Sequence, residues 1–236
     1  MILFYSKEIS GDEAILDEEE SRHCAQVLRK RPGDNIHLID GVGGFYRAVL
    51  DEVHRKKCTA RILEQLPNNQ ARDFKVHLAI APTKNMARIE WLLEKITEIG
   101  IDEISLVICR HSERTKVRLD RLEKILLSAT KQSLKARLPV IHPLFSFKDF
   151  FEKLDIGKDG KKYIGYIDEN VNEGIKDNYL PGKDVCILIG PEGGFSREEV
   201  DLAMKHGFQA VSLGKSRLRT ETAGLVACHT IHLLNA

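Results

Sequence analysis

The spacing of hydrophobic and polar residues changes partway along the chain. In the first part, short apolar runs are separated by turn residues, as in 35–40 and 45–53. Short runs bounded in this way are typical of β-strands joined by tight turns. One short helix is expected over 23–34, where Pro32 and Gly33 would end it. This part of the chain therefore predicts a small domain built mainly of β-strands.

After a polar stretch at 64–73, apolar runs alternate with amphipathic segments. The apolar residues of 86–100 recur at helical spacing, and Gly100 closes that segment. The segment 119–129 has the same spacing. A helix is also expected to begin at Ser196. The remaining expected strands and helices are 74–82, 103–108, 138–144, 161–167, 184–190, 196–207, 210–214 and 220–234.

Strands that alternate with helices predict an α/β fold with a mostly parallel sheet covered on both faces. The helix after Ser196 is expected to start with a capping box, because Glu199 follows three residues later. The polar stretch at 64–73 contains Pro67 and two asparagines, which favour a linker. We therefore expect two domains, 1–70 and 71–236.

Composition narrows the class of protein. Of the 236 residues, 42% are hydrophobic and 30% are charged, which is ordinary for a soluble domain. No apolar stretch is long enough to span a membrane, and the start lacks the pattern of a signal peptide. The five cysteines are widely separated and form no CxxC pair, so we expect no disulfide framework and no metal site. A cytoplasmic protein is expected.

Charge is distributed unevenly although the net charge is only +1. The window 110–137 holds nine Lys and Arg residues against three Asp and Glu residues. A basic cluster of this kind is a candidate surface for RNA or another polyanion. A solvated helix face would have the same composition, and both interpretations stay open.

Two glycine-containing loops carry the candidate chemistry. The loop at 190–194 follows an apolar strand, and the segment 213–224 combines glycine, arginines and threonines before an apolar helix. Ligands of parallel sheets bind beyond the carboxyl ends of the strands, so two such loops predict a shared binding site. The loop at 190–194 has neither the lysine of a phosphate-binding loop nor the glycine spacing of a dinucleotide motif. The glycines of 41–44 lack a following helix and are interpreted as a turn.

Four segments resemble one known family. They are "LAIAPTKNMARIEWLLEKITEIG", "RHSERT", "IGPEGGFSREEV" and "LGKSRLRTETA", and "HCAQVLRKRPGD" is similar to that family's N-terminal motif. Together they resemble the RsmE family of 16S ribosomal RNA methyltransferases in the SPOUT superfamily. The resemblance covers nearly the whole chain.

The resemblance implies a fold and partners that residue patterns do not. It implies an α/β-knot with a deep C-terminal trefoil knot over 71–236, preceded by a PUA-like, RNA-binding β-barrel over 1–70. It also implies S-adenosyl-L-methionine as the cofactor, 16S rRNA in the small ribosomal subunit as the substrate, and a homodimer. No metal and no membrane contact are implied.

The resemblance also assigns roles to individual residues. Arg219 and Glu221 are the catalytic candidates. The implied cofactor-binding residues are Ala81, Pro82, Ile189, Gly190, Pro191, Glu192, Gly193, Leu213, Gly214, Leu218, Arg219, Thr220, Thr222 and Ala223. The implied RNA-binding residues are Arg29, Lys84, Arg88, Arg110, Ser112, Glu113, Arg114, Lys116, Arg118 and Gln132.

The implied reaction is methylation of N3 of a uridine near the 3′ end of 16S rRNA. N3 carries a proton and lies on the Watson–Crick edge, so the base must be unpaired and the proton must be lost. Arg219 would stabilise the uracil anion, and Glu221 is the weaker candidate for the base. Ribose 2′-O methylation by another SPOUT enzyme, a non-catalytic RNA-binding protein and a nucleotide hydrolase are the alternatives.

Overall fold

The protein is described by a computed structural model that covers residues 1–67, 72–157 and 159–236. These residues divide into two compact units. The first unit contains 1–67 and 127–138, and the second contains the remaining described residues. The expected domain boundary at residue 70 and the centre of the polar stretch at 64–73 lie outside the described residues.

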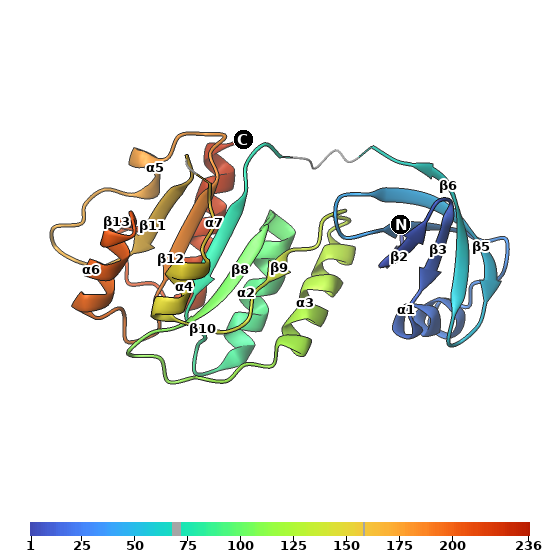
Figure 1. Ribbon diagram of the computed structural model, residues 1–236, viewed down its shortest axis with the longest axis horizontal. Coiled ribbons are helices and arrows are strands. Elements are labelled where there is room, and N and C mark those ends of the chain that lie inside the picture. The colour runs from blue at the N-terminus through green and yellow to red at the C-terminus, as the bar shows by residue number, and fades with distance from the viewer. Residues whose placement is uncertain (68–71, 158) are drawn as a thin grey trace. The chain divides into compact units, whose positions relative to one another are not determined.

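The first unit is built on one six-stranded sheet (Figure 1). Its order is β1-β4-β5-β6-β3-β2, in which only β1 and β4 pair in parallel. Shifts in the register between β5 and β6 interrupt the ladder, and bulges of this kind increase the local bend and twist. The strands are β1 (Leu3–Tyr5), β2 (Glu8–Ser10), β3 (Glu13–Leu16), β4 (Asn35–Ile39), β5 (Phe45–Val53) and β6 (Cys58–Gln65).

The helical segment of this unit lies closer to the N-terminus than the sequence predicts. Helix α1 spans Glu18–Arg22, and a π-helical turn continues it over His23–Val27. Asp17 caps α1 by accepting a hydrogen bond from the Glu20 N–H at 2.8 Å. Arg29 has a φ of 52°, which ends the helical path before Pro32 is reached. The overlooked start signal was Asp17 followed by three glutamates, which favour a helix N-terminus.

The glycines of 41–44 form a turn, as predicted. One carboxylate oxygen of Asp40 accepts hydrogen bonds from the N–H groups of Val42, Gly43 and Gly44. Gly41 also accepts a hydrogen bond from the Leu138 N–H at 2.8 Å, within the same unit. The turn therefore has a structural role and shows no feature of a phosphate loop.

The second unit contains a parallel sheet with the order β10-β8-β7-β12-β11-β13, and β9 pairs with β8. Every pairing in this sheet is parallel, which confirms the predicted α/β class. The strands are β7 (Val76–Ile80), β8 (Glu103–Ile108), β9 (Val140–Ile141), β10 (Phe145–Ser146), β11 (Lys161–Gly165), β12 (Val185–Ile189) and β13 (Gln209–Val211). The helices are α2 (Met86–Ile99), α4 (Phe147–Lys153), α5 (Ile175–Asn178), α6 (Arg197–Lys205) and α7 (Thr220–Leu234). Helix α3 (Leu119–Gln132) begins in this unit, and its residues from 127 onward belong to the first unit.

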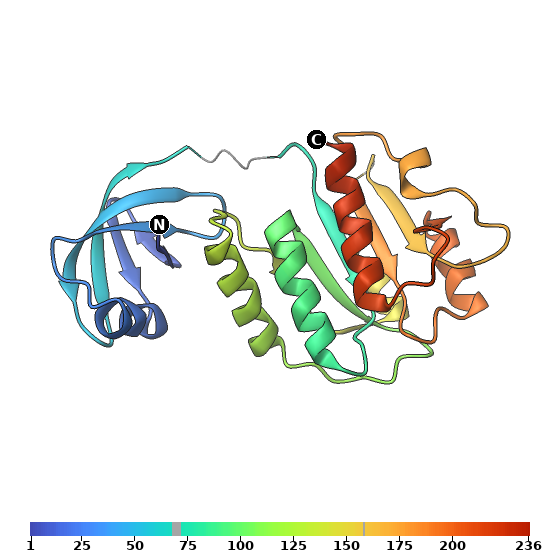
Figure 2. The same ribbon diagram turned by 180° about the vertical axis from the view of Figure 1, so that it is seen from behind.

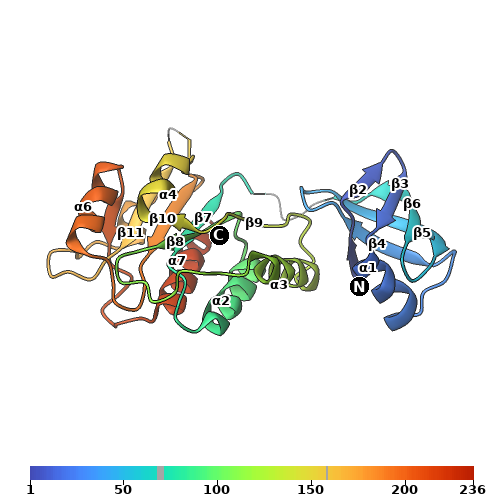
Figure 3. The same cartoon turned by 60° about the horizontal axis from the view of Figure 1, so that its bottom comes forward.

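Helices cover both faces of this sheet. Helices α2 and α7 pack side by side on one face (Figure 2). Gly224 of α7 permits this close packing, since an added Cβ would lie 3.0 Å from Leu92 and 3.2 Å from Ile80. Helices α4 and α6 lie on the opposite face, seen from another side in Figure 3. Phe147, Phe150 and Phe151 of α4 form much of the core there.

The sequence predicted most elements of this unit. Helix α2 ends at Gly100 with a φ of 126°, and both hydrogen bonds of the capping box at Ser196 and Glu199 are present. Helix α4 was not predicted, and the strand expected at 138–144 is reduced to the two residues of β9. All five cysteines are free and buried. Among the described residues, no helix has the length and apolarity to cross a membrane.

Candidate functional site

The two late loops meet at one pocket of about 810 Å³. One wall is the glycine-rich loop, residues 190–194, which follows β12. The other is the basic loop, residues 213–219, which leads into α7. The lining residues are Gly165, Tyr166, Ile167, Ile189, Gly190, Pro191, Glu192, Gly193, Gly194, Phe195, Leu213, Gly214, Lys215, Ser216, Arg217, Leu218, Arg219, Thr220 and Ala223.

Eleven of the fourteen predicted cofactor-binding residues line this pocket. Ala81 and Pro82 do not line it, because they are buried behind the glycine-rich loop. Ala81 donates its N–H to the carbonyl of Ile189 at 3.0 Å and so continues the pairing of β7 with β12. Thr222 also lies outside the lining. These residues can support the pocket wall without forming it.

Gly190 and Gly193 of the glycine-rich loop lie so close to neighbouring side chains that a Cβ atom at either position would crowd them. An added Cβ at Gly190 would lie 3.0 Å from the ring of Phe195. An added Cβ at Gly193 would lie 2.9 Å from the Cβ of His111, where a real Cβ contact is not found. Neither glycine has a positive φ, so the constraint at both positions is steric. The two glycines therefore allow Phe195 and His111 to pack directly against the backbone of the loop.

Glu192 ties the glycine-rich loop to the loop that follows β7. Its carboxylate accepts a hydrogen bond from the backbone N–H of Lys84 at 3.0 Å. The hydroxyl of Thr83, a buried residue, donates to the carbonyl of Asn85 at 2.8 Å, and the side chain of Asn85 caps α2. The loop after β7, which holds the predicted cofactor-binding residues Ala81 and Pro82, is thus joined to the pocket through Glu192.

The basic loop brings three exposed cations to the pocket: Lys215, Arg217 and Arg219. Within the part of the chain that the structure describes, the guanidinium of Arg219 makes no ion pair or hydrogen bond. Arg219 is also the N-cap residue of α7, so the free N–H groups of that helix lie beside it. The surroundings suit an anionic group of a ligand or substrate.

Glu221, in the first turn of α7, is buried and does not line the pocket. Its Oε1 lies 3.8 Å from Nε of Arg88, which belongs to α2. Its other oxygen is buried without a hydrogen-bond partner among the described residues. The geometry therefore pairs Glu221 with Arg88 across two packed helices, away from the space in which a ligand would sit.

Sequence reasoning missed the third wall, which is the end of β11 with Gly165, Tyr166 and Ile167. An added Cβ at Gly165 would lie 3.1 Å from Ile189 and 3.4 Å from Leu213. The available signal was a glycine at the carboxyl end of a buried parallel strand. The side of the pocket formed by this strand is more apolar than the basic loop, and Ile167 is 79% exposed.

The start of the basic window lies against the pocket wall. His111 contacts the glycine-rich loop, with Nδ1 3.1 Å from the carbonyl oxygen of Gly194. Arg114 donates two hydrogen bonds to the carbonyl of Lys84, at 3.2 and 2.8 Å. Lys84 forms an ion pair with Glu113 at 2.8 Å, and this hydrogen bond raises the pKa of the lysine. The predicted RNA-binding residues Lys84, Glu113 and Arg114 are thus held together by local contacts.

The remaining predicted RNA contacts are more dispersed. Arg110 reaches Glu198 at 3.4 Å and Arg118 reaches Asp120 at 2.8 Å, both in exposed ion pairs. The hydroxyl of Ser112 accepts a hydrogen bond from the N–H of Cys109 at 3.0 Å. Burial of Cys109 raises the pKa of its thiol, which argues against a nucleophilic role.

Lys116 is exposed and has no ion-pair partner in the described residues. Arg29 and Gln132 are exposed residues of the first unit.

Two known protein families match this chain, each over its own range of residues. Residues 70–232 match the RNA methyltransferase domain, and residues 16–63 match the RNA methyltransferase PUA domain. A relative from Synechocystis named ribosomal RNA small subunit methyltransferase E is 31% identical over 93% of this chain and 72% of its own length.

Solved structures are similar over the full length. A probable rRNA methyltransferase from Porphyromonas gingivalis is 44% identical, with a TM-score of 0.89, over 100% of this chain and 98% of its own. A ribosomal RNA small subunit methyltransferase E from Neisseria gonorrhoeae, solved with bound S-adenosyl methionine, is 32% identical over the same shares with a TM-score of 0.87.

Proposed function

The chain belongs to the RNA methyltransferase family whose members are named ribosomal RNA small subunit methyltransferase E, and we propose that it methylates 16S rRNA with S-adenosylmethionine as the donor. The target we propose is N3 of a uridine near the 3′ end of that RNA. The pocket formed by the two late loops is the observation that carries this proposal.

The residues of the pocket fit the cofactor. A volume of about 810 Å³ lies within the range of small-molecule sites, which is roughly 300–1,000 Å³. Backbone groups of the glycine-rich loop, which lines the pocket, would face the nucleoside part. The apolar wall at Ile167 and Leu213 suits the adenine ring, and the basic loop suits the carboxylate of the methionine part. When bound, S-adenosylmethionine supplies a methyl group that its sulfonium centre has already activated.

The protein's own residues must handle the uridine proton. Loss of the N3 proton leaves negative charge on the uracil ring, and a fixed cation lowers the free energy of that anion. Arg219 is the residue we assign to this role, because it lines the pocket and its guanidinium has no described protein partner. Glu221 is a weaker candidate for the proton acceptor, because it is paired with Arg88.

The RNA would bind along the rim formed by Lys84, Arg110, Arg114 and Lys116. Contacts of these cations with phosphates would position the RNA without reading its sequence. The PUA domain would add a second contact surface, with Arg29 as one candidate. The homodimer, the trefoil knot and the cytoplasmic location remain predictions that follow from the family resemblance.

The proposal is tested by product analysis. Small ribosomal subunits that lack the modification are incubated with the protein and labelled S-adenosylmethionine, and the digested RNA is analysed as nucleosides. We expect label in 3-methyluridine. Label in a ribose-methylated nucleoside would identify a different SPOUT activity, and RNA binding without transfer would identify a non-catalytic binding protein.

A further inference from the structure

A second cavity, of about 440 Å³, lies near the amino ends of β7, β8 and β12, at the other end of the strands from the cofactor pocket. Its lining includes His77, the second residue of β7, Glu103 at the start of β8 and His142 just after β9. The cofactor pocket lies at the carboxyl ends of β11 and β12. His77 and Glu103 lie near the amino ends of β7 and β8, and His142, which follows β9, lies beside the start of β8. The proposed methylation does not use them.

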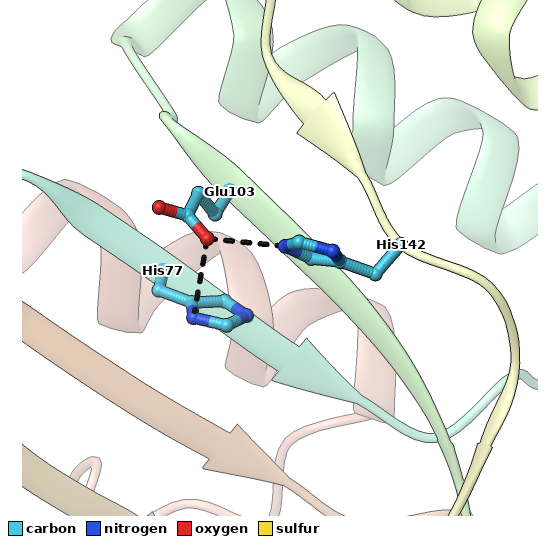
Figure 4. Close-up of side chains that lie close together, drawn as sticks. All are labelled: His77, Glu103 and His142. Atoms are coloured by element: carbon cyan, nitrogen blue, oxygen red, sulfur yellow. Dashed lines mark hydrogen bonds and ion pairs between the residues drawn. The ribbon is translucent and has the colours of Figure 1, made fainter. Parts of the chain in front are cut away.

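The register of the strands brings the three side chains together (Figure 4). His77 and Glu103 are direct partners in the pairing of β7 with β8, and the N–H of His142 bonds to the carbonyl of Ile104. Glu103 Oε2 lies 3.0 Å from His142 Nε2 and 4.0 Å from His77 Nδ1. One ligand atom from each residue lies within 4.8 Å of the other two.

The ring of His77 carries a nitrogen without a partner. His77 is 7% exposed, and its Nδ1 has no hydrogen-bond partner among the described residues. Its Nε2 lies 2.9 Å from the hydroxyl of Ser105, and Phe150 packs edge-on against the ring. Ser105 therefore holds the ring so that the unpaired nitrogen faces Glu103 and His142. A purely structural His–Glu hydrogen bond accounts for His142 and leaves the buried nitrogen of His77 unexplained.

We propose that His77, Glu103 and His142 form a binding site for a divalent transition-metal ion, with Zn²⁺ as the preferred occupant. Two imidazoles and one carboxylate are a ligand set that zinc uses, with the fourth position left to water or another small ligand. A serine that fixes the orientation of a ligating histidine is the expected supporting contact. The proposal revises the expectation of no metal site, which was derived from cysteine spacing and the family resemblance.

The dimensions of the cluster are compatible with this assignment. Bonds of about 2.0–2.1 Å in a tetrahedral site place ligand atoms about 3.3 Å apart. The described separations bracket this value, and the half-buried side chains of Glu103 and His142 can rotate to meet it. The cavity gives room for the fourth ligand. Lys75 and Lys153 line it together with Asp155, Asp184 and Glu103, so carboxylates outnumber the lysines by one.

The test uses the full-length protein after treatment with a chelator. Isothermal titration with Zn²⁺ is expected to show one tight site per chain, and Co²⁺ is expected to give the visible absorption of a tetrahedral complex. Because removal of a supporting residue alone costs about 10–100-fold in affinity, His142→Ala should weaken Zn²⁺ binding by more than about 100-fold. Ser105→Ala should weaken it by about tenfold.

The matched control is His54→Ala, which removes an exposed histidine of the first unit and should leave Zn²⁺ affinity unchanged. Glu103→Gln keeps the shape of the side chain and replaces His142→Ala if that variant does not fold, as judged by circular dichroism. The proposal is overturned if the wild-type protein binds no Zn²⁺. It is also overturned if the variants of His142 and Glu103 bind Zn²⁺ as the wild type does, since the ion would then lie elsewhere.

Discussion

The carboxylate of Glu192 accepts a hydrogen bond from the backbone N–H of Lys84 and thereby joins the loop after β12 to the loop after β7. The glycine-rich loop has few side chains of its own with which to hold its position. The hydrogen bond that the Lys84 N–H donates to Glu192 and the close contact of Gly193 with His111 supply that restraint. The shape of the cofactor pocket therefore depends on residues from separate parts of the second unit.

We expect Glu192→Ala to weaken cofactor binding. Loss of one exposed hydrogen bond to a carboxylate costs about 1 kcal/mol, which corresponds to about a fivefold change in affinity. Titration with S-adenosylhomocysteine, which lacks the transferred methyl group, measures the affinity of each variant for the cofactor. Glu198→Ala is the control, because Glu198 has an exposed ion pair with Arg110 and does not line the pocket. Equal cofactor affinities for the two variants would mean that Glu192 does not hold the glycine-rich loop in place.

Gly193→Ala is expected to weaken cofactor binding more strongly, because the added Cβ would overlap the Cβ of His111 at 2.9 Å. Overpacking of this kind costs about 1–3 kcal/mol. The double variant Gly193→Ala with His111→Gly removes the opposing atom and should recover part of the affinity. No recovery in the double variant would mean that the glycine is needed for a reason other than this contact.

Arg219→Ala is expected to lower kcat by about 100-fold, the scale on which loss of one transition-state charge partner acts. Rates measured with small ribosomal subunits at saturating S-adenosylmethionine separate this effect from cofactor binding. Arg197→Ala is the control, since Arg197 is exposed on α6 and pairs with Asp201 at 3.3 Å. A kcat near the wild-type value would exclude Arg219 from the chemical step.

Glu221→Gln distinguishes a structural carboxylate from a general base. Because Glu221 is buried beside Arg88 and does not line the pocket, we expect the thermal midpoint to fall while kcat changes by less than about tenfold. Thermal unfolding and single-turnover rates measured on the same preparation give both quantities. The opposite result, an unchanged midpoint with methyl transfer abolished, would assign proton removal to Glu221.

Replacement of Arg110 and Arg114 by glutamine is expected to weaken RNA binding and to flatten its dependence on salt. Removing one arginine–phosphate interaction reduces the slope of log K against log salt by about 0.7–0.9. Binding of a 16S rRNA fragment across a salt series measures the slope. Arg197→Gln removes an exposed, ion-paired arginine of α6 to which no RNA contact is assigned, and serves as the control. An unaltered slope in the first variant would mean that this part of the basic window is only solvated.

Local sequence determined most of the secondary structure. The predicted helices at 86–100 and 220–234 follow from the spacing of apolar residues, and the helix after Ser196 follows from its capping box with Glu199. Their bounds agree with the structure, because caps and periodicity act over a few residues. The glycines of the two late loops likewise indicated a ligand site. Helix α4 was not predicted, because it is stabilised by the packing of its three phenylalanines against α6 and the sheet, which lies beyond the local sequence.

Only the tertiary structure decided which side chains meet. The pairing of Glu221 with Arg88, the third pocket wall at Gly165 and the cluster of His77, Glu103 and His142 each join residues distant in sequence. Their proximity depends on the order and register of the strands and on helix packing, which are set by the burial of the whole core. The sequence could therefore indicate the kind of chemistry, whereas the register of the folded sheet selected the residues able to perform it.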